Sequence, residues 1–465
     1  MAQTKLIAAV WLHGGEACLV TENHIAHKLI VGFMWAAATA VTILLAHRRY
    51  NVGNVIGADF KIWLQAARDV AARRSPWRPS PLGLFVYPPT IPLVLAPFAH
   101  AAEPVRLWHV WTGLEIAAFV AGVVAFVCNV APRLRTWQLP LVFGFCSVTV
   151  LHFWPVTLAL YYGQSDAFVF AVLLWAGLAS SRARATAFGI LIGVAGLLKG
   201  WPVVLAVVLW QRGLEGRRRA VTAFVVTILL APIMIIAVGG VSCVTGFLQN
   251  NADARNQHLA SASVWGAPKL LFSRTESASP LFVSPAVRLV VTAMFLAWVV
   301  GLLVSAIRTP GDPSMCMWNV LLCVVLLLPI SHLWYTLYAL PLLWIWGCRV
   351  LERAPKWDYR EIAVVAILLV WWTVQYKRRT NQDLGPDPTM LSSARYCVVF
   401  GANLIACTFS VIGARTVMGP TQQQACGAGQ HRPLTGRHLA RDDGCVRYCV
   451  KSRIRRWDDS TARWR

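Results

Sequence analysis

The feature that most constrains this sequence is a succession of long apolar segments. A helix that crosses a hydrocarbon core of ~30 Å needs ~20 residues, and about twelve stretches are apolar enough, several of them short or interrupted by proline. They lie roughly at 29–46, 88–103, 107–129, 138–160, 166–180, 186–210, 220–240, 287–307, 318–330, 334–347, 361–376 and 395–418. With 57% hydrophobic residues, 14% charged residues and 22 tryptophans, the chain is too apolar for a soluble domain. The pattern predicts an all-α polytopic membrane protein.

The apolar pattern also divides the chain. The stretch before Lys28 is polar, and no small-residue cleavage site follows the first apolar run, so we expect this run to be a retained anchor. Residues 1–28 are then a cytoplasmic segment and 29–418 the transmembrane domain. Residues 419–465 hold a basic tail, for which we expect disorder on the cytoplasmic face, in contact with anionic lipid, rather than a zinc site.

The net charge of +23 follows from short basic loops between the apolar segments. The clearest are "PRLR" (132–135), "SRAR" (181–184), "QRGLEGRRR" (211–219) and "RVLERAPKWDYR" (349–360). The positive-inside rule explains such loops without nucleic-acid binding and predicts that they are cytoplasmic. Large loops at 47–87 and 241–286 then lie outside, provided that 88–100 dips in and returns and that 186–211 is two short helices broken at "KGWP".

Cysteine usage gives no sign of a disulfide framework. Of the twelve cysteines, at least seven fall within or at the ends of apolar segments, where cysteine acts as a small hydrophobic residue. These are Cys128, Cys146, Cys243, Cys323, Cys348, Cys397 and Cys407.

The outer loop 47–87 breaks the charge rule. It carries seven basic residues, namely Arg48, Arg49, Lys61, Arg68, Arg73, Arg74 and Arg78, against the two acids Asp59 and Asp69. The basic residues could contact anionic headgroups or hold a phosphorylated lipid substrate.

Asp59 is the more interesting acid of this loop. Apolar Ile56, Phe60 and Trp63 surround it at helical spacing, which predicts a short amphipathic helix at the membrane interface. Its carboxylate could pair with Arg68 or Lys61, although Asp69 is the better candidate for a structural ion pair.

Three further motifs follow along the chain. In "LFVYPPTIPLVLAPF" (84–98) the paired prolines predict a helix that begins after Pro89. In "YYGQSDAFVF" (161–170) Gly163 permits a tight turn and Asp166 could cap the next helix. In "GILIGVAGLLKGWPVVL" (189–205) Lys199 interrupts an apolar run, which makes it either a functional residue or a side chain that snorkels to the headgroups.

Two late motifs are more ambiguous. "NNADARNQHLAS" (250–261) is an amide-rich outer loop that could be surface decoration, and "LLPISHLWYTLYALP" (327–341) places His332 between apolar segments, where a histidine is often structural.

The order of these motifs resembles glycosyltransferase family 87, membrane mannosyltransferases of the GT-C fold. The resemblance rests on Asp59 followed by "FVYPP", "YYGQSD", "AGLLKGWP", "ARNQHL" and "LPISHLWYTLY", over about residues 30–350. It implies transfer of a hexose, expected to be mannose, from a polyprenyl-phosphate donor to a glycolipid or polysaccharide hydroxyl, with inversion, on the outer face of the plasma membrane.

The resemblance also implies residue roles. Asp59 corresponds to the catalytic base; Tyr87, Gln164, Lys199, Asn256, Gln257 and His332 correspond to binding positions, and Arg68 is a candidate for the lipid phosphate. The chain departs from the family at Asp166, where Asn is usual, at His258, where Ser is frequent, and in the late "LPISH". No cofactor is expected, and no Asp-x-Asp motif for a metal is visible.

A transporter or lipid flippase is the alternative. It predicts internal repeats and paired charges at the bilayer midplane. The sequence displays no repeat, and we expect no second intramembrane charge facing Lys199. A purely structural assembly partner is a third possibility.

Overall fold

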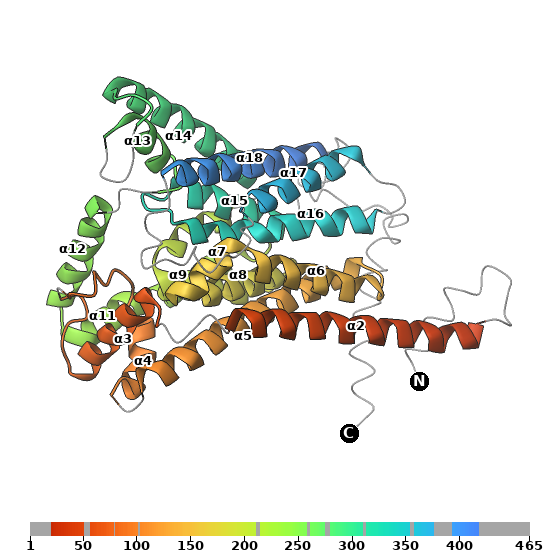
Figure 1. Ribbon diagram of the computed structural model, residues 1–465, viewed down its shortest axis with the longest axis horizontal. Coiled ribbons are helices and arrows are strands. Elements are labelled where there is room, and N and C mark those ends of the chain that lie inside the picture. Colours follow the sequence, from red (N-terminus) through yellow and green to blue (C-terminus); the bar gives the residue numbers. More distant parts are fainter. Residues whose placement is uncertain are drawn as a thin grey trace, which may run out of the picture. The chain divides into compact units, whose positions relative to one another are not determined.

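The computed structural model describes residues 20–50, 56–78, 80–100, 103–210, 214–257, 261–274, 280–309, 313–353, 358–375 and 393–417, and these ranges contain helices and connecting segments but no β-strand. In chain order (Figure 1) the α-helices are α2 (Val20–Tyr50), α3 (Ala58–Ala71), α4 (Thr90–Leu95), α5 (Pro104–Val130), α6 (Gln138–His152), α7 (Trp154–Tyr162), α8 (Asp166–Ser181), α9 (Ala185–Lys199), α10 (Arg217–Ile228), α11 (Leu230–Gly239), α12 (Ser242–Gln257), α13 (Gly266–Phe272), α14 (Pro285–Arg308), α15 (Pro313–Leu327), α16 (Leu340–Glu352), α17 (Tyr359–Gln375) and α18 (Ser393–Val417). Short 3₁₀ helices are η1 (Ala96–Phe98), η2 (Ala131–Arg133), η3 (Trp201–Trp210) and η4 (Leu333–Ala339).

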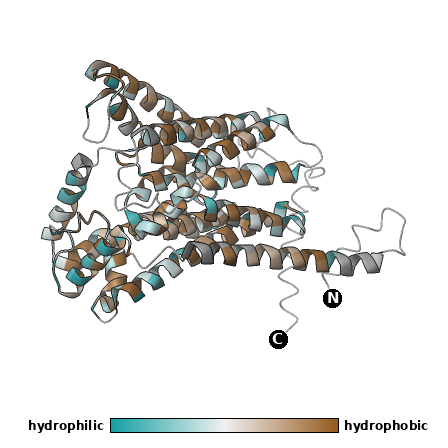
Figure 2. Cartoon of the chain, viewed as in Figure 1, coloured by the Kyte–Doolittle hydropathy of each residue, from teal (hydrophilic) through white to brown (hydrophobic). Residues whose placement is uncertain are grey.

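Several helices are long and apolar enough to cross a membrane. Among the described residues these are five, within α2, α5 with η2, α10 with α11, α14, and α18; α6 and α7 add a sixth if this pair, bent by 60°, counts as one span. Figure 2 shows the apolar colour along these helices. On α14, Leu289 is 70% and Met294 64% exposed, which suits a surface covered by lipid. The all-helical membrane architecture is therefore confirmed, and the total of twelve crossings stays a prediction.

The short and broken segments follow from glycine and proline. The described residues 88–100 make no separate span, because the helices that form there are the six-residue α4 and the 3₁₀ turn η1. The predicted break at "KGWP" is confirmed: α9 ends at Lys199, Gly200 has φ +80°, and η3 begins at Trp201. The predicted helix start after Pro89 is confirmed too, since α4 begins at Thr90.

A large apolar core holds α5 to α9 together with α15 to α18. Some helices approach very closely; at Gly189 of α9, an added Cβ would lie 2.0 Å from the carbonyl oxygen of Ala220 in α10. Glycine at helix contacts is a common device in membranes, because backbones gain dispersion contacts where side chains are absent. These helices form a packed support for the elements at their ends.

A second, smaller core lies at one end of these helices. It joins α3, the segment 72–89, α4, η1, the first turns of α5, α11 and α12, and its buried members include Phe60, Trp63, Trp77, Phe85 and Trp108. We call α3, the segment 72–89, α4 and α12 the cap. The predicted outer loops 47–87 and 241–286 both contribute to it, so they lie at the same end.

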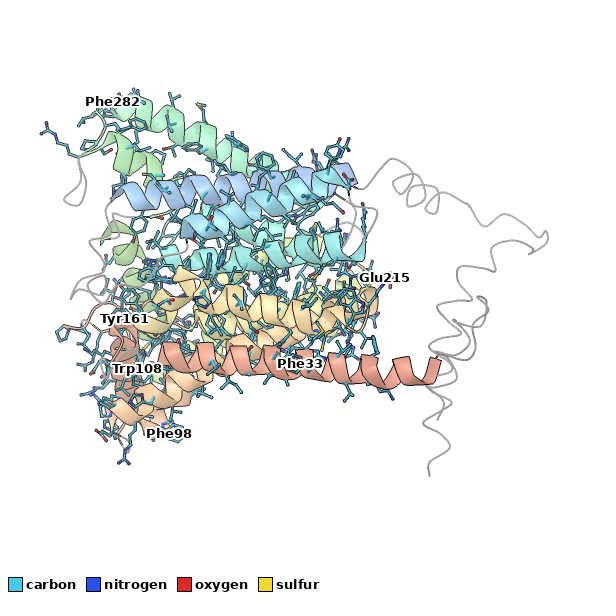
Figure 3. All side chains as sticks on the ribbon, turned by 45° about the vertical axis from the view of Figure 1, so that its right-hand side comes forward. Phe33, Phe98, Trp108, Tyr161, Glu215 and Phe282 are labelled. Atoms are coloured by element: carbon cyan, nitrogen blue, oxygen red, sulfur yellow. The ribbon has the colours of Figure 1, made fainter. Side chains whose placement is uncertain are left out.

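The basic loops gather at the other end. Arg133 Nε lies 3.3 Å from Glu352 Oε1, and Arg182 donates to the Cys128 carbonyl at 3.4 Å, so loops that follow α5, α8 and α16 meet. Figure 3 shows Glu215, of the loop 211–219, far from Tyr161 and Trp108 beside the cap. The prediction that the basic loops and the outer loops lie at opposite ends of the helices is thus confirmed. Helix α5 runs between the two ends, and its 27 residues are about 40 Å long.

Candidate active site

Asp59 lies in the first turn of α3, on the surface where the cap meets the bundle. As predicted, α3 is amphipathic, with Phe60 and Trp63 fully buried. The Asp59 carboxylate makes no pair with Arg68 or Lys61 in the structure; it accepts a short hydrogen bond from Gln164 Nε2 instead. This hydrogen bond joins the first outer loop to the "YYGQSD" turn.

Asp69 has the structural role that the sequence favoured for it. Its side chain is 2% exposed and pairs with Arg78 at 2.7 Å and Arg74 at 3.3 Å. These ion pairs tie the end of α3 to the segment that follows it. Two of the loop arginines are therefore already engaged with a carboxylate.

Gly57 sets how closely α3 approaches the turn. A Cβ at this position would lie 2.6 Å from the backbone carbonyl of Tyr162 and 2.7 Å from that of Tyr161. Only a residue without a side chain fits there, and Asp59 follows two positions later. The close contact at Gly57 therefore fixes the distance between the start of α3 and the turn, and with it the position of Asp59 relative to Gln164.

If Asp59 is the base that the resemblance implies, Gly57→Ala should lower sugar transfer by up to about 100-fold, because a displacement near 1 Å of a catalytic group has an effect of this size. Gly113→Ala is the matched control, since a Cβ at Gly113 would meet nothing within 4 Å. Activity and membrane level of both variants should be measured together. Full activity of Gly57→Ala would show that the contact does not position Asp59.

The turn before α8 places two polar side chains. Gly163 has φ +72°, as the predicted tight turn requires, and an added Cβ would lie 2.6 Å from the Trp108 ring. Asp166 does not cap α8, which was one possible role for it: Ser165 is the N-cap residue, and no side-chain capping bond forms. The Asp166 oxygens instead bind Lys199 and accept a 2.6 Å hydrogen bond from Tyr338 Oη.

Lys199 is the centre of the cluster. It is the last residue of α9, 3% exposed, and its ammonium pairs with Asp166 and donates to Gln164 Oε1 at 3.0 Å. The Nζ also lies 4.7 Å from the ring centroid of Tyr335, in cation–π range. The snorkelling alternative is therefore wrong. So is the expectation that no second charge faces Lys199, because Asp166 is paired with it.

These contacts fix the orientation of Gln164. An ammonium group only donates, so the side of the amide that faces Lys199 must be the carbonyl oxygen. The amide nitrogen then points at Asp59. Tyr87 contributes on the oxygen side, with its Oη 3.5 Å from Gln164 Oε1, and its ring stacks on Trp63 at 4.5 Å between centroids. Gln164 thus links Lys199 to Asp59 through hydrogen bonds on the two sides of its amide group.

The electrostatics single out Asp59 as a titratable group. Desolvation by its surroundings raises the pKa of this carboxyl from 3.8 to about 6, although Lys199 and the Gln164 hydrogen bond lower it. Asp59 stays partly exposed, whereas Gln164, Asp166 and Lys199 are buried. Burial raises the pKa of Tyr87 well above its usual range, so its phenol keeps its proton and donates. A base with a pKa just below neutrality suits proton abstraction at physiological pH.

The other residues singled out in the sequence lie at different distances from this cluster. His332 stacks on Trp334 at 4.2 Å and contacts the Tyr335 ring that lies over Lys199, so it borders the cluster. Arg68 is nine residues after Asp59, on the opposite side of α3, and donates from Nε to the Ala99 carbonyl at 3.3 Å.

Two predicted binding residues are placed only by their backbone. Asn256 and Gln257 end α12, and their side chains, like the neighbouring His258, lie outside the described residues. Across the described ranges, no three His, Cys, Asp or Glu side chains gather in a way that could hold a metal ion.

Glu115 is a buried acid that the sequence reading missed. It lies in the predicted span 107–129 and is fully buried, one helical turn from Trp111, with which its carboxyl interacts. Its helix neighbours Trp111 and Phe119 pack on Phe168 and Phe170 of α8, so Glu115 faces the first turns of that helix. It is close enough to Lys199 and Asp166 to interact electrostatically. An acid within an apolar span was the signal that could have identified it.

We predict that Glu115→Gln keeps the transfer activity implied by the resemblance within about threefold of wild type, because an amide of the same shape replaces the buried carboxyl and can still accept a hydrogen bond. Initial rates and the membrane level of the variant test this. A loss of most activity at normal level would mean that Glu115 must ionise.

The comparison with known protein families matches residues 85–329, more than half of the chain, to the model of glycosyltransferase family 87. A search of curated proteins found no match. The matched range includes Tyr87, Gln164, Asp166 and Lys199; Asp59 precedes it, and the hydrogen bond to Gln164 brings it to them. The resemblance seen in the motifs is therefore confirmed, and this membrane protein with its buried charged cluster belongs to glycosyltransferase family 87.

Proposed function

We propose that this glycosyltransferase moves a hexose, mannose by the family resemblance, from a polyprenyl-phosphate donor to a hydroxyl of a glycolipid or polysaccharide, with Asp59 as the base. The observation that carries the proposal is the environment of Asp59. Its carboxylate is partly exposed, has a pKa of about 6, and is held by a hydrogen bond from Gln164 at the edge of a buried charged cluster.

The reaction would be a single displacement. Asp59 takes the proton of the acceptor hydroxyl, the hydroxyl oxygen forms a bond to the anomeric carbon, and the bond from that carbon to the phosphate oxygen breaks. The lipid monophosphate leaves with the electron pair, and phosphate is a good leaving group that needs no general acid. Attack from the opposite face inverts the anomeric centre. A positioned base of this kind contributes about 10²- to 10⁴-fold in rate.

Lys199, one of the binding positions that the resemblance implies, has an indirect role in this proposal. Its ammonium is buried and engaged by Gln164, Asp166 and the Tyr335 ring. We therefore assign it to two tasks: it holds Gln164 in the orientation that Asp59 needs, and its charge favours the ionised form of Asp59.

We therefore assign binding of the donor phosphate to the exposed arginines of the cap. Arg74 and Arg78 share the single carboxylate of Asp69, which leaves one net positive charge, and their side chains are 54% and 44% exposed. Guanidinium groups bind phosphate oxygens in a bidentate geometry. This surface suits the headgroup of a phosphorylated lipid better than Arg68, which donates to Ala99.

The distribution of charge supports an outward-facing site. The basic loops meet at the end of the bundle that is opposite to the cap. If these loops obey the positive-inside rule, the cap and Asp59 face the outside of the plasma membrane.

The transporter alternative gains one feature, since Lys199 and Asp166 are paired charges, although they lie at the ends of apolar helices beside the cap. Product analysis distinguishes the two functions. Membranes that contain the protein should convert radiolabelled polyprenyl-phosphate mannose into labelled glycolipid or polymer, and a radiolabelled nucleotide sugar should not replace the donor. A transporter would move the label between leaflets without forming a glycosidic bond, and this outcome would refute the proposal.

A further inference from the structure

Helix α12 holds the segment that leads into Tyr87 through two neighbouring amides. Asn250, 7% exposed, donates from Nδ2 to the Trp77 and Phe85 carbonyls, each at 3.0 Å. Asn251 donates from Nδ2 to the Val86 carbonyl at 3.1 Å. Consecutive carbonyls directly before Tyr87 are thus held by consecutive residues of one helix.

Other side chains of the cap contact the same segment. Trp77 Nε1 donates to the Tyr87 carbonyl at 3.3 Å, and Trp77 is itself packed against Phe247 of α12 at 5.8 Å between ring centroids. Trp63 stacks on the Tyr87 ring. The backbone carbonyls of residues 85, 86 and 87 therefore all accept hydrogen bonds from side chains of the cap.

These contacts are long-range, which argues against simple surface decoration. Asn250 and Asn251 are separated by about 165 residues from the segment that they bind. The described residues of the 72–89 segment, 72–78 and 80–89, form no regular helix or strand, so their backbone groups depend on such side chains. Without them, little would hold Tyr87 at the distance from which its hydroxyl reaches Gln164.

We infer that Asn250 and Asn251 are positioning residues for the reaction: they fix the backbone before Tyr87 so that its phenol orients Gln164, and through Gln164, Asp59. The inference rests on the proposed role of Asp59. It also gives α12 a task within the active site, because the helix that ends in Asn256 and Gln257 is locked to the "FVYPP" segment.

Asn251→Ala tests the inference, because Asn251 is only half-buried and its loss leaves the second amide in place. We expect kcat to fall by about tenfold, equivalent to roughly 1.4 kcal/mol, with KM for the donor little changed. Gln249→Ala, at an exposed position of the same helix, is the matched control and should keep wild-type rates.

A double-mutant cycle with Tyr87→Phe separates positioning from general weakening. If Asn251 acts through the Tyr87 hydroxyl, Asn251→Ala should cost little further activity once that hydroxyl is gone. Fully additive losses would overturn the inference, as would unchanged kinetics of Asn251→Ala.

Hydrogen exchange provides a readout that does not depend on the reaction. Amides of residues 84–87 should exchange faster in Asn251→Ala than in wild type, and Gln249→Ala should leave them unchanged. Unchanged exchange would refute the inference even if activity fell. Conversely, if Asp59→Asn kept full activity while exchange rose in Asn251→Ala, the proposed base would be wrong and the structural link would stand.

Discussion

Asp59→Asn is expected to reduce sugar transfer by about 10²- to 10⁴-fold while the protein remains inserted and folded. The amide keeps the shape of the carboxylate and its oxygen still accepts the hydrogen bond from Gln164. It cannot take a proton from an acceptor hydroxyl. The measurement is the initial rate with radiolabelled polyprenyl-phosphate mannose at matched protein level; a rate near wild type would remove Asp59 as the base.

The same substitution should not destabilise the protein. The folded state raises the pKa of Asp59 from 3.8 to about 6, so stability falls as the pH rises between these values. Above pH 6 the ionised carboxylate costs about 3 kcal/mol, if each pKa unit is worth 1.36 kcal/mol. Asp59→Asn removes this cost, so its advantage in thermal unfolding should be larger at pH 8 than at pH 5.

Asp69→Asn is the matched control, because the two acids belong to the same helix. Asp69 is buried and paired with two arginines, so its loss should lower the unfolding temperature. Opposite stability changes in the two variants would distinguish an acid kept for chemistry from an acid kept for structure. If Asp59→Asn lowered stability as Asp69→Asn does, the loss of activity would carry no information on catalysis.

Much of this architecture could be predicted from the sequence because it depends on local patterns. Apolar length predicts helices, the paired prolines predict where α4 begins, and Gly200 with Pro202 predicts where α9 ends. The amphipathic pattern around Asp59 likewise predicts α3. Each of these features depends on residues within one or two helical turns, so a single chain displays them without an alignment.

The pairing of charges could not be predicted in the same way. Asp166 and Lys199 are 33 residues apart, and only the packing of α8 against α9 brings them together. Before that packing is known, Asp166 resembles a helix cap and Lys199 an isolated cation. Glu115 is a single acid in an apolar span, and its approach to Lys199 depends on the same packing. Asn250 looked like surface decoration because its acceptors lie in a distant loop.

Lys199→Met and Asp166→Asn should move the acid limb of the pH–rate profile in opposite directions. The Lys199 charge lowers the pKa of Asp59 and the Asp166 charge raises it. If Asp59 is the base, activity requires its ionised form and should therefore rise through about pH 6 in the wild type. Lys199→Met should shift this rise to higher pH, and Asp166→Asn should shift it to lower pH. Residual rates between pH 5 and 8 measure both shifts.

Stability supplies the second arm of the same test. Removing one partner of a buried ion pair leaves an uncompensated charge and costs about 3–5 kcal/mol, whereas replacing both partners with uncharged residues is often nearly neutral. We therefore expect each single variant to unfold at a lower temperature than the double variant Lys199→Met/Asp166→Asn. The double variant should nevertheless transfer sugar slowly, because Gln164 has lost the ammonium that orients it. Wild-type activity in the double variant would show that the pair serves only to stabilise the fold, and that Asp59 is positioned without it.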